Sequence, residues 1–235
     1  MNIFRKAFTL AEVLITLGVI GVVAAMTIPT ISVNVVGHKY RNQYKKTMST
    51  ISQAVRLNKA NYDWDFADVA VGCGGSDFQT HTSDNIMSVC AIFNSNLSSV
   101  TGYFRESVLE NKYNYKFRGD LIGLTAGGGQ YTVYGLADGS FIGFRSVSFA
   151  NGCTVPVGKT ISNVAMAHCT GFIDVNGFSL PNEEIKCSVG TTSRDLSKKC
   201  IVKNKDVKDV FPIIYHDATV EPATNAAKYV YQTTK

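Results

Sequence analysis

The longest apolar run in the chain opens with the stretch Lys6-Ala7-Phe8-Thr9-Leu10-Ala11-Glu12 and continues through Ile28 to Pro29. A helix rises about 1.5 Å per residue, so residues 8–28 match the ~30 Å hydrocarbon core of a bilayer. Glu12 is the only ionisable side chain in this run. A carboxylate in hydrocarbon is costly and needs a partner. The sequence therefore predicts a transmembrane helix over residues 8–29, with Glu12 as a candidate functional residue.

The pattern changes after Pro29, where apolar side chains occupy one helical face. Tyr44, Met48, Ile51 and Val55 follow one another at steps of four, three and four residues. We therefore expect one long helix from Phe8 to about Tyr62, interrupted or softened near Pro29 and Gly37, because proline and glycine weaken helices. Residues 30–62 form its amphipathic extension, whose apolar face packs on the rest of the chain.

Residues 63–235 form a globular head, long enough to bury a core of its own. Its many glycines and aromatic residues indicate turns and strands. The fold class expected is α+β, with the long N-terminal helix packed on an antiparallel β-sheet. The expected elements are a turn cluster over 72–85, a helix bearing Ile86, Cys90, Phe93, Leu97 and Val100, strands from about Tyr115, a hairpin over 131–144 that turns at Asp138-Gly139, and strands over 170–175 and 211–215.

All six cysteines follow the apolar run, and no C-x-x-C spacing occurs. An even number of cysteines outside the cytosol is typical of disulfides. We expect neighbours in sequence to pair; buried free thiols are the alternative. The expected pairs are Cys73–Cys90, Cys153–Cys169 and Cys187–Cys200.

Charge and motifs give no indication of an enzyme or of a cofactor. The net charge is +5, and the basic cluster over 38–46 is more typical of a solvated helix face than of a nucleic-acid site. Oxygen-bearing side chains gather at Asp174, Asn176, Glu183 and Glu184, but the calcium-loop pattern is missing and Asn176-Gly177 reads as a hairpin turn. We therefore expect no metal. The histidines, at positions 38, 81, 168 and 216, are scattered.

The stretch from Lys6 to Ile15 resembles the N-terminal processing segment of type IV pilins and type II secretion pseudopilins. In that family a peptidase removes a short basic leader just before a phenylalanine, which is then methylated. The resemblance implies a leader over residues 1–7, cleavage between Ala7 and Phe8, and Glu12 as the fifth mature residue. Pro29 falls at the twenty-second, where the family often has a proline. The departure is Ala7, because the family usually has glycine before the cut.

This resemblance implies a structural subunit that forms a homo-polymer through its N-terminal helix. Its partners would be a prepilin peptidase and the pilus or secretion assembly machinery. Before assembly it would lie in the inner membrane with its head outside the cytosol. After assembly it would be part of a periplasmic or extracellular filament. The amine freed at Phe8 of one subunit would pair with Glu12 of another, because an unpaired buried charge is strongly unfavourable.

Three other interpretations stay open at this point. The chain could be a minor subunit that caps a filament or binds a ligand, or the helix could be a plain membrane anchor. It could also be a secreted binding protein whose signal peptide is cut after Val23-Ala24-Ala25, leaving Met26 first. The sequence does not separate a pilus from a secretion pseudopilus.

Overall fold

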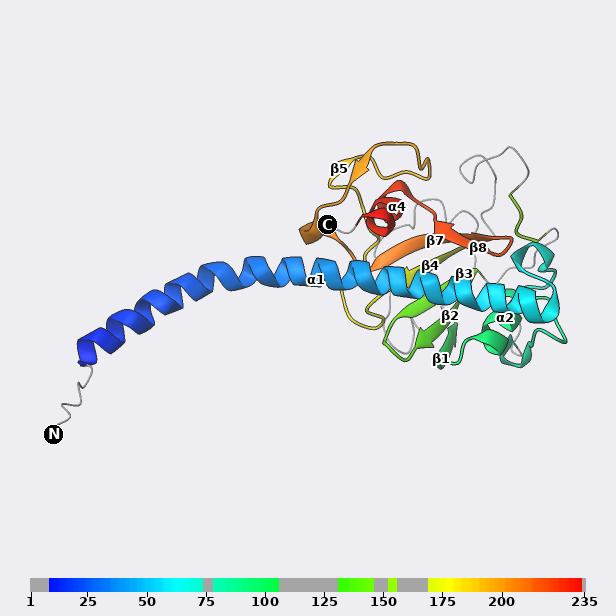
Figure 1. The fold of residues 1–235 in the computed structure, drawn as a ribbon, viewed down its shortest axis with the longest axis horizontal. Helices are drawn as coiled ribbons and strands as arrows, with labels where there is room; N and C mark the ends of the chain where they lie inside the picture. The colour runs from blue at the N-terminus through cyan, green and yellow to red at the C-terminus, as the bar shows by residue number, and fades with distance from the viewer. Residues whose placement is uncertain (1–8, 74–77, 106–130, 146–151, 156–168, 234–235) are drawn as a thin grey trace, which may run out of the picture.

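The computed structural model describes residues 9–73, 78–105, 131–145, 152–155 and 169–233. Helix α1, Leu10–Tyr62, begins with an N-terminal arm, Leu10–Ile28, that is not buried against the head. It then runs along the whole head (Figure 1). It begins at the N-cap Thr9 and ends at Asp63, whose left-handed backbone, with φ 61°, stops the helix. The helix passes Pro29 and Gly37 without a break, so an interruption there is wrong, while the alternative expectation of a softened helix stays a prediction. Proline removes one backbone hydrogen bond, and long helical flanks on both sides maintain the helix.

The head contains an antiparallel sheet of six strands in the order β1-β2-β3-β4-β7-β8. An α+β fold, with an N-terminal apolar helix and an antiparallel sheet, is therefore confirmed. The strands are β1 Val100–Arg105, β2 Tyr131–Leu136, β3 Phe141–Arg145, β4 Thr170–Asp174, β7 Val210–His216 and β8 Thr219–Pro222. A separate two-stranded ribbon joins β5, Val189–Gly190, to β6, Cys200–Ile201.

Short helices pack around α1 and the sheet. Helix α2, Val89–Asn96, and helix α4, Asn225–Gln232, both contact α1. Among the described residues, the 3₁₀ turns are η1 Phe66–Asp68, η2 Phe78–Thr80 and η5 Asn204–Asp206. Of these, η5 contacts α1 where the bare arm enters the head.

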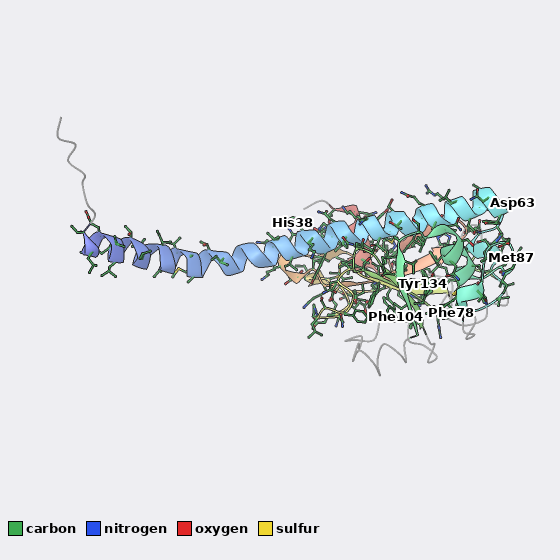
Figure 2. All side chains as sticks on the ribbon, turned by 90° about the horizontal axis from the view of Figure 1, so that it is seen from below. His38, Asp63, Phe78, Met87, Phe104 and Tyr134 are labelled. Atoms are coloured by element: carbon green, nitrogen blue, oxygen red, sulfur yellow. A yellow bond between two sulfur atoms is a disulfide. The ribbon has the colours of Figure 1, made fainter. Side chains whose placement is uncertain are left out.

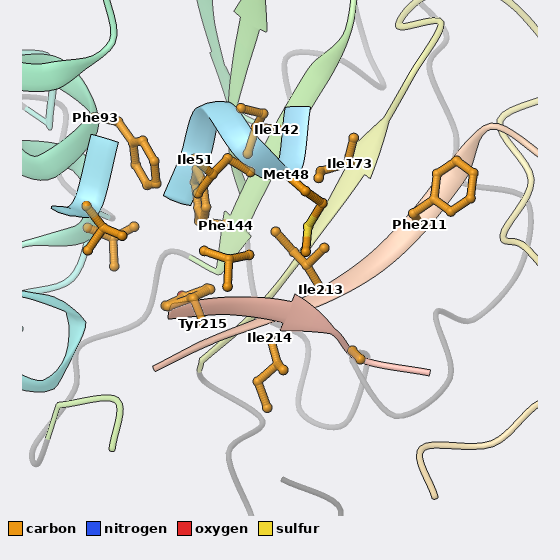
Figure 3. Packing of buried hydrophobic residues seen from close by; sticks show 14 of the residues in the cluster. Met48, Ile51, Phe93, Ile142, Phe144, Ile173, Phe211, Ile213, Ile214 and Tyr215 are labelled. Atoms are coloured by element: carbon orange, nitrogen blue, oxygen red, sulfur yellow. The ribbon is translucent and has the colours of Figure 1, made fainter. Parts of the chain in front are cut away.

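The main core lies between α1 and one face of the sheet. Met48 and Ile51 of α1 lie over Ile142, Ile173 and Ile213 from three strands (Figure 3). Because side chains alternate along a strand, the neighbouring residues point to the opposite face and form a second cluster there. That cluster contains Tyr131, Val133, Phe141, Phe172 and Val210. The predicted stripe on residues 44–55 is therefore the buried face of α1.

Several predicted elements need correction. The hairpin β2–β3 turns at Asp138-Gly139 as expected. The helix expected over residues 86–100 is shorter, because Val100 already pairs with Leu136 in β1. Asn176-Gly177 lies in a turn after β4 and not in a hairpin, because β4 pairs with β3 and β7. The strand expected from Tyr115 lies outside the described residues.

Candidate functional site

The bare arm of α1 is the most unusual surface of the molecule. Leu10–Ile28 is long and apolar enough to cross a membrane, and none of this segment is buried against the head. Leu10 is 81% exposed and Ile15 is 67% exposed. Soluble monomers rarely expose a contiguous apolar surface of this extent. The arm therefore needs a lipid or protein environment that the single chain does not supply.

Glu12 lies in the first turn of this arm and forms a capping box with Thr9. Its Oε2 accepts hydrogen bonds from the Thr9 backbone N–H at 2.8 Å and the Thr9 hydroxyl at 2.9 Å. In return, Thr9 Oγ1 accepts from the Glu12 backbone N–H at 3.2 Å. A carboxylate at this position also interacts favourably with the positive end of the helix dipole. The chain's own cap therefore supplies the Glu12 carboxylate with two hydrogen-bond donors.

Sequence reasoning missed the role of Thr9, although the T-x-x-E spacing of a capping box is readable in the sequence. The predicted cleavage residues, Ala7 and Phe8, lie outside the described residues, so the cleavage remains a prediction. Pro29 lies inside α1, well beyond the first turn. The structure does not bring Pro29 together with Glu12.

Arg41 is almost completely buried, with 1% of its surface exposed. Its side chain connects α1 to the C-terminal end of α4. Its Nη1 donates to the carbonyl oxygens of Val230 and Thr233, each at 3.2 Å, and to the Thr233 hydroxyl. Its Nη2 donates to Asn204 Oδ1 at 3.0 Å. Burial lowers the pKa of the Arg41 guanidinium. A cation at the negative end of a helix is stabilising, so Arg41 fastens both α4 and η5 to α1.

Two further residues complete this junction. Lys45 Nζ donates to the Thr233 carbonyl at 2.8 Å, and burial, followed by the nearby charge of Arg41, lowers the pKa of Lys45. Gly37 lies against the Asn204 carbonyl so closely that a Cβ atom would overlap it. Gly37 is also the first residue of α1 beyond the arm that is described as buried. Beyond the arm, α1 therefore enters the head at Gly37.

The hydrophobic part of the junction is centred on Tyr44. Its ring stacks on Phe211 with centroids 4.1 Å apart, and the side chain is fully buried. Burial raises the pKa of Tyr44 well above its usual range. Its hydroxyl has no hydrogen-bond partner among the described residues. Tyr44 thus contributes mainly by packing.

The structure joins the six cysteines in the predicted pairs, and none of them is free. The pairs are Cys73–Cys90, Cys153–Cys169 and Cys187–Cys200, which enclose sequence separations of 17, 16 and 13 residues. The first connects a loop to α2. The second connects Cys153 to Cys169, the residue just before β4. The third connects the β5–β6 ribbon to the segment that precedes it. Disulfides of this kind are typical of oxidising compartments.

Two of the oxygen-bearing residues considered for calcium, Asp174 and Glu183, make other contacts in the described structure. Asp174 Oδ1 accepts from the backbone N–H groups of Asn176, at 3.1 Å, and Gly177, at 3.0 Å. Glu183 forms an ion pair with Lys208 at 2.6 Å. Within the described ranges, no three His, Cys, Asp or Glu side chains gather as metal ligands would. His38, His81 and His216 lie apart, and His168 falls outside those ranges.

Comparisons with protein-family models, with curated proteins and with solved structures gave no match.

Proposed function

We propose that the chain is a structural filament subunit of the kind found in type IV pili and type II secretion pseudopili. The single observation that carries this proposal is the arm Leu10–Ile28, which is apolar, unburied and continuous with the helix that supports the head. Because one continuous helix joins the two parts, the position of each arm in a filament would fix the position of its head. The three disulfides support a head that lies outside the cytosol.

In this proposal a prepilin peptidase cuts between Ala7 and Phe8, and the assembly machinery extracts the subunit from the inner membrane. The new amine of an incoming subunit then approaches Glu12 of a docked subunit. The Thr9 donors hold the Glu12 carboxylate at the start of the helix until that amine arrives. Each charge in the apolar interior of the filament would then have a partner, which the burial of charges requires.

Glu12→Gln tests this pairing, because glutamine retains a cap acceptor and removes the charge. We expect E12Q to insert in the membrane normally and to yield at least tenfold fewer filaments, consistent with loss of about 1.4 kcal/mol or more per contact. Filaments would be sheared from cells that carry the assembly machinery and quantified by immunoblotting.

Two variants control for the loss of the cap and for the chemical change itself. Thr9→Val removes the cap and keeps the charge, so it should reduce assembly less than E12Q does. Glu221→Gln makes the same chemical change on β8 of the head and should assemble normally. Normal filament yield from E12Q would contradict the pairing.

A second candidate is a secreted binding protein cut before Met26. One observation favours it: a signal sequence also produces an N-terminal apolar helix, and residues before Gly37 add nothing to the described core. The two candidates differ in whether the mature protein keeps the arm.

A further inference from the structure

We propose that the end of the head that faces the membrane docks on anionic phospholipid headgroups, through a basic collar made of Lys39, Lys203 and Lys205. This inference rests on the membrane anchoring in the proposed function. The three lysines are exposed, and they belong to two segments far apart in sequence. Their ligand would be the phosphate-bearing surface of the bilayer that holds the chain's own arm.

The structure fixes both segments of the collar at the point where the arm enters the head. Asn204 lies over Gly37, its amide nitrogen lies 3.0 Å from His38 Nε2, and its Oδ1 accepts from Arg41. Lys203 and Lys205 flank Asn204 and are therefore held beside the Gly37 side of α1. Lys39 follows Gly37 by two residues, about 200° around the helix, so the three lysines surround α1 from opposite sides. Figure 2 shows His38 at this end of the head and Asp63 at the opposite end.

The distance to the membrane is short enough for these charges to act. Gly37 follows Ile28 by nine residues, or about 14 Å of helix. The headgroup layer occupies about 5–8 Å of this length. The remaining gap of about 6–9 Å is close to the Debye length of ~8 Å at physiological ionic strength. Anionic headgroups would therefore attract the collar without complete screening.

A second observation points to the same surface. Val35 and Val36, in the gap between arm and head, are 60% and 41% exposed. Apolar side chains beside lysines are typical of segments that lie at a membrane interface. The three lysines outnumber Asp206, the acidic residue of η5, and Lys208 is paired with Glu183. Asp174 and Asp209, which lie near Tyr40, are buried and accept hydrogen bonds from backbone N–H groups.

Lysine acetylation in nanodiscs tests the inference with the full-length chain. One set of nanodiscs contains phosphatidylcholine only, and the other contains phosphatidylcholine with phosphatidylglycerol. We expect Lys39, Lys203 and Lys205 to react about fivefold more slowly in the anionic discs, the factor for one lysine near an anionic surface. Lys59, in the last turn of α1 at the far end of the head, is the internal control. High salt should abolish the difference.

Paired variants identify the residues responsible. K203Q/K205Q should weaken the docking of this end of the head and so reduce the protection of Lys39 in part. K198Q/K199Q should leave it intact, since this exposed pair lies by the first turn of α4, where the Lys198 carbonyl accepts from Asn225. Protection by soluble glycerol phosphate in phosphatidylcholine discs would instead reveal a site for free phosphate and overturn membrane docking.

Equal acetylation in both lipids, in chains that remain inserted, would overturn this inference and leave the filament proposal standing. A chain that does not insert in either disc would overturn both.

Discussion

At the scale of single residues, Arg41 matters most for the connection between arm and head. Its guanidinium reaches two segments that follow it by more than 160 residues, at Asn204 and at Val230–Thr233. Removing it would leave the buried carbonyls of α4 with fewer donors and would leave space within the junction. Arg41 therefore adds a buried polar connection to the apolar packing that holds α1 on the head.

We expect Arg41→Met to lower the free energy of unfolding by roughly 2–4 kcal/mol, because methionine fills part of the space and donates no hydrogen bond. The measurement is denaturant unfolding of the oxidised full-length chain in mild detergent, followed by near-UV circular dichroism. Arg56→Met, on an exposed position of the same helix, should change stability by less than about 0.5 kcal/mol. Equal stability of the two variants would show that the Arg41 contacts are not needed.

At the scale of elements, α1 serves two environments with one continuous helix. Its arm makes no contact with the head, whereas the segment from Gly37 onward packs against the sheet, α2, α4 and η5. Glycine has a different role in each part. Gly18 has open space around its Cα, while Gly37 permits the close approach of η5.

This contrast gives opposite expectations for the same substitution. Gly37→Ala should destabilise the head by about 1–3 kcal/mol, since the added Cβ would displace the Asn204 backbone. Gly18→Ala should leave the stability of the head unchanged, because nothing lies near the added Cβ atom. Within the arm itself, alanine favours the helix over glycine by up to about 1 kcal/mol. Thermal unfolding of both variants in detergent checks this. A G37A head as stable as the wild type would mean that η5 can shift without cost.

The sequence was informative where the signals are local. Asp138-Gly139 marked the hairpin, and the stripe from Tyr44 to Val55 marked the buried helix face. The even number of cysteines indicated disulfides, but their spacing does not choose among the possible pairings; the structure confirms the expected pairing of sequence neighbours. Strand β8 and helix α4 were not predicted. Both depend on tertiary contacts: β8 on pairing with β7, and the end of α4 on Arg41, which lies far away in sequence.

At the scale of the whole molecule, the structure is a compact head on a long apolar arm (Figure 1). The head has its own core and three disulfides, so it is stabilised independently of the arm. The arm makes no buried contact with the head, so the head does not stabilise it. The head also contains buried tyrosines. Burial raises the pKa values of Tyr44, Tyr134 and Tyr215.

Raised tyrosine pKa values make the stability of the head depend on alkaline pH. An unfolded tyrosine titrates near pH ~10 and the folded ones titrate higher, so the unfolded state loses protons first. Stability should therefore be unaffected by these groups below pH ~9 and should fall above pH ~10. Denaturant midpoints measured across this range in the Tyr44→Phe variant should show a weaker fall. An equally steep fall in the wild type and in the Tyr44→Phe variant would contradict this expectation.

The mass and N-terminal sequence of the mature protein test the proposed function most directly. The protein should be purified from membranes of cells that carry a prepilin peptidase. We expect the chain to start at N-methylated Phe8 and to retain the whole arm Leu10–Ile28. A mature chain that starts at Met26 and is found outside the membrane would contradict the filament proposal.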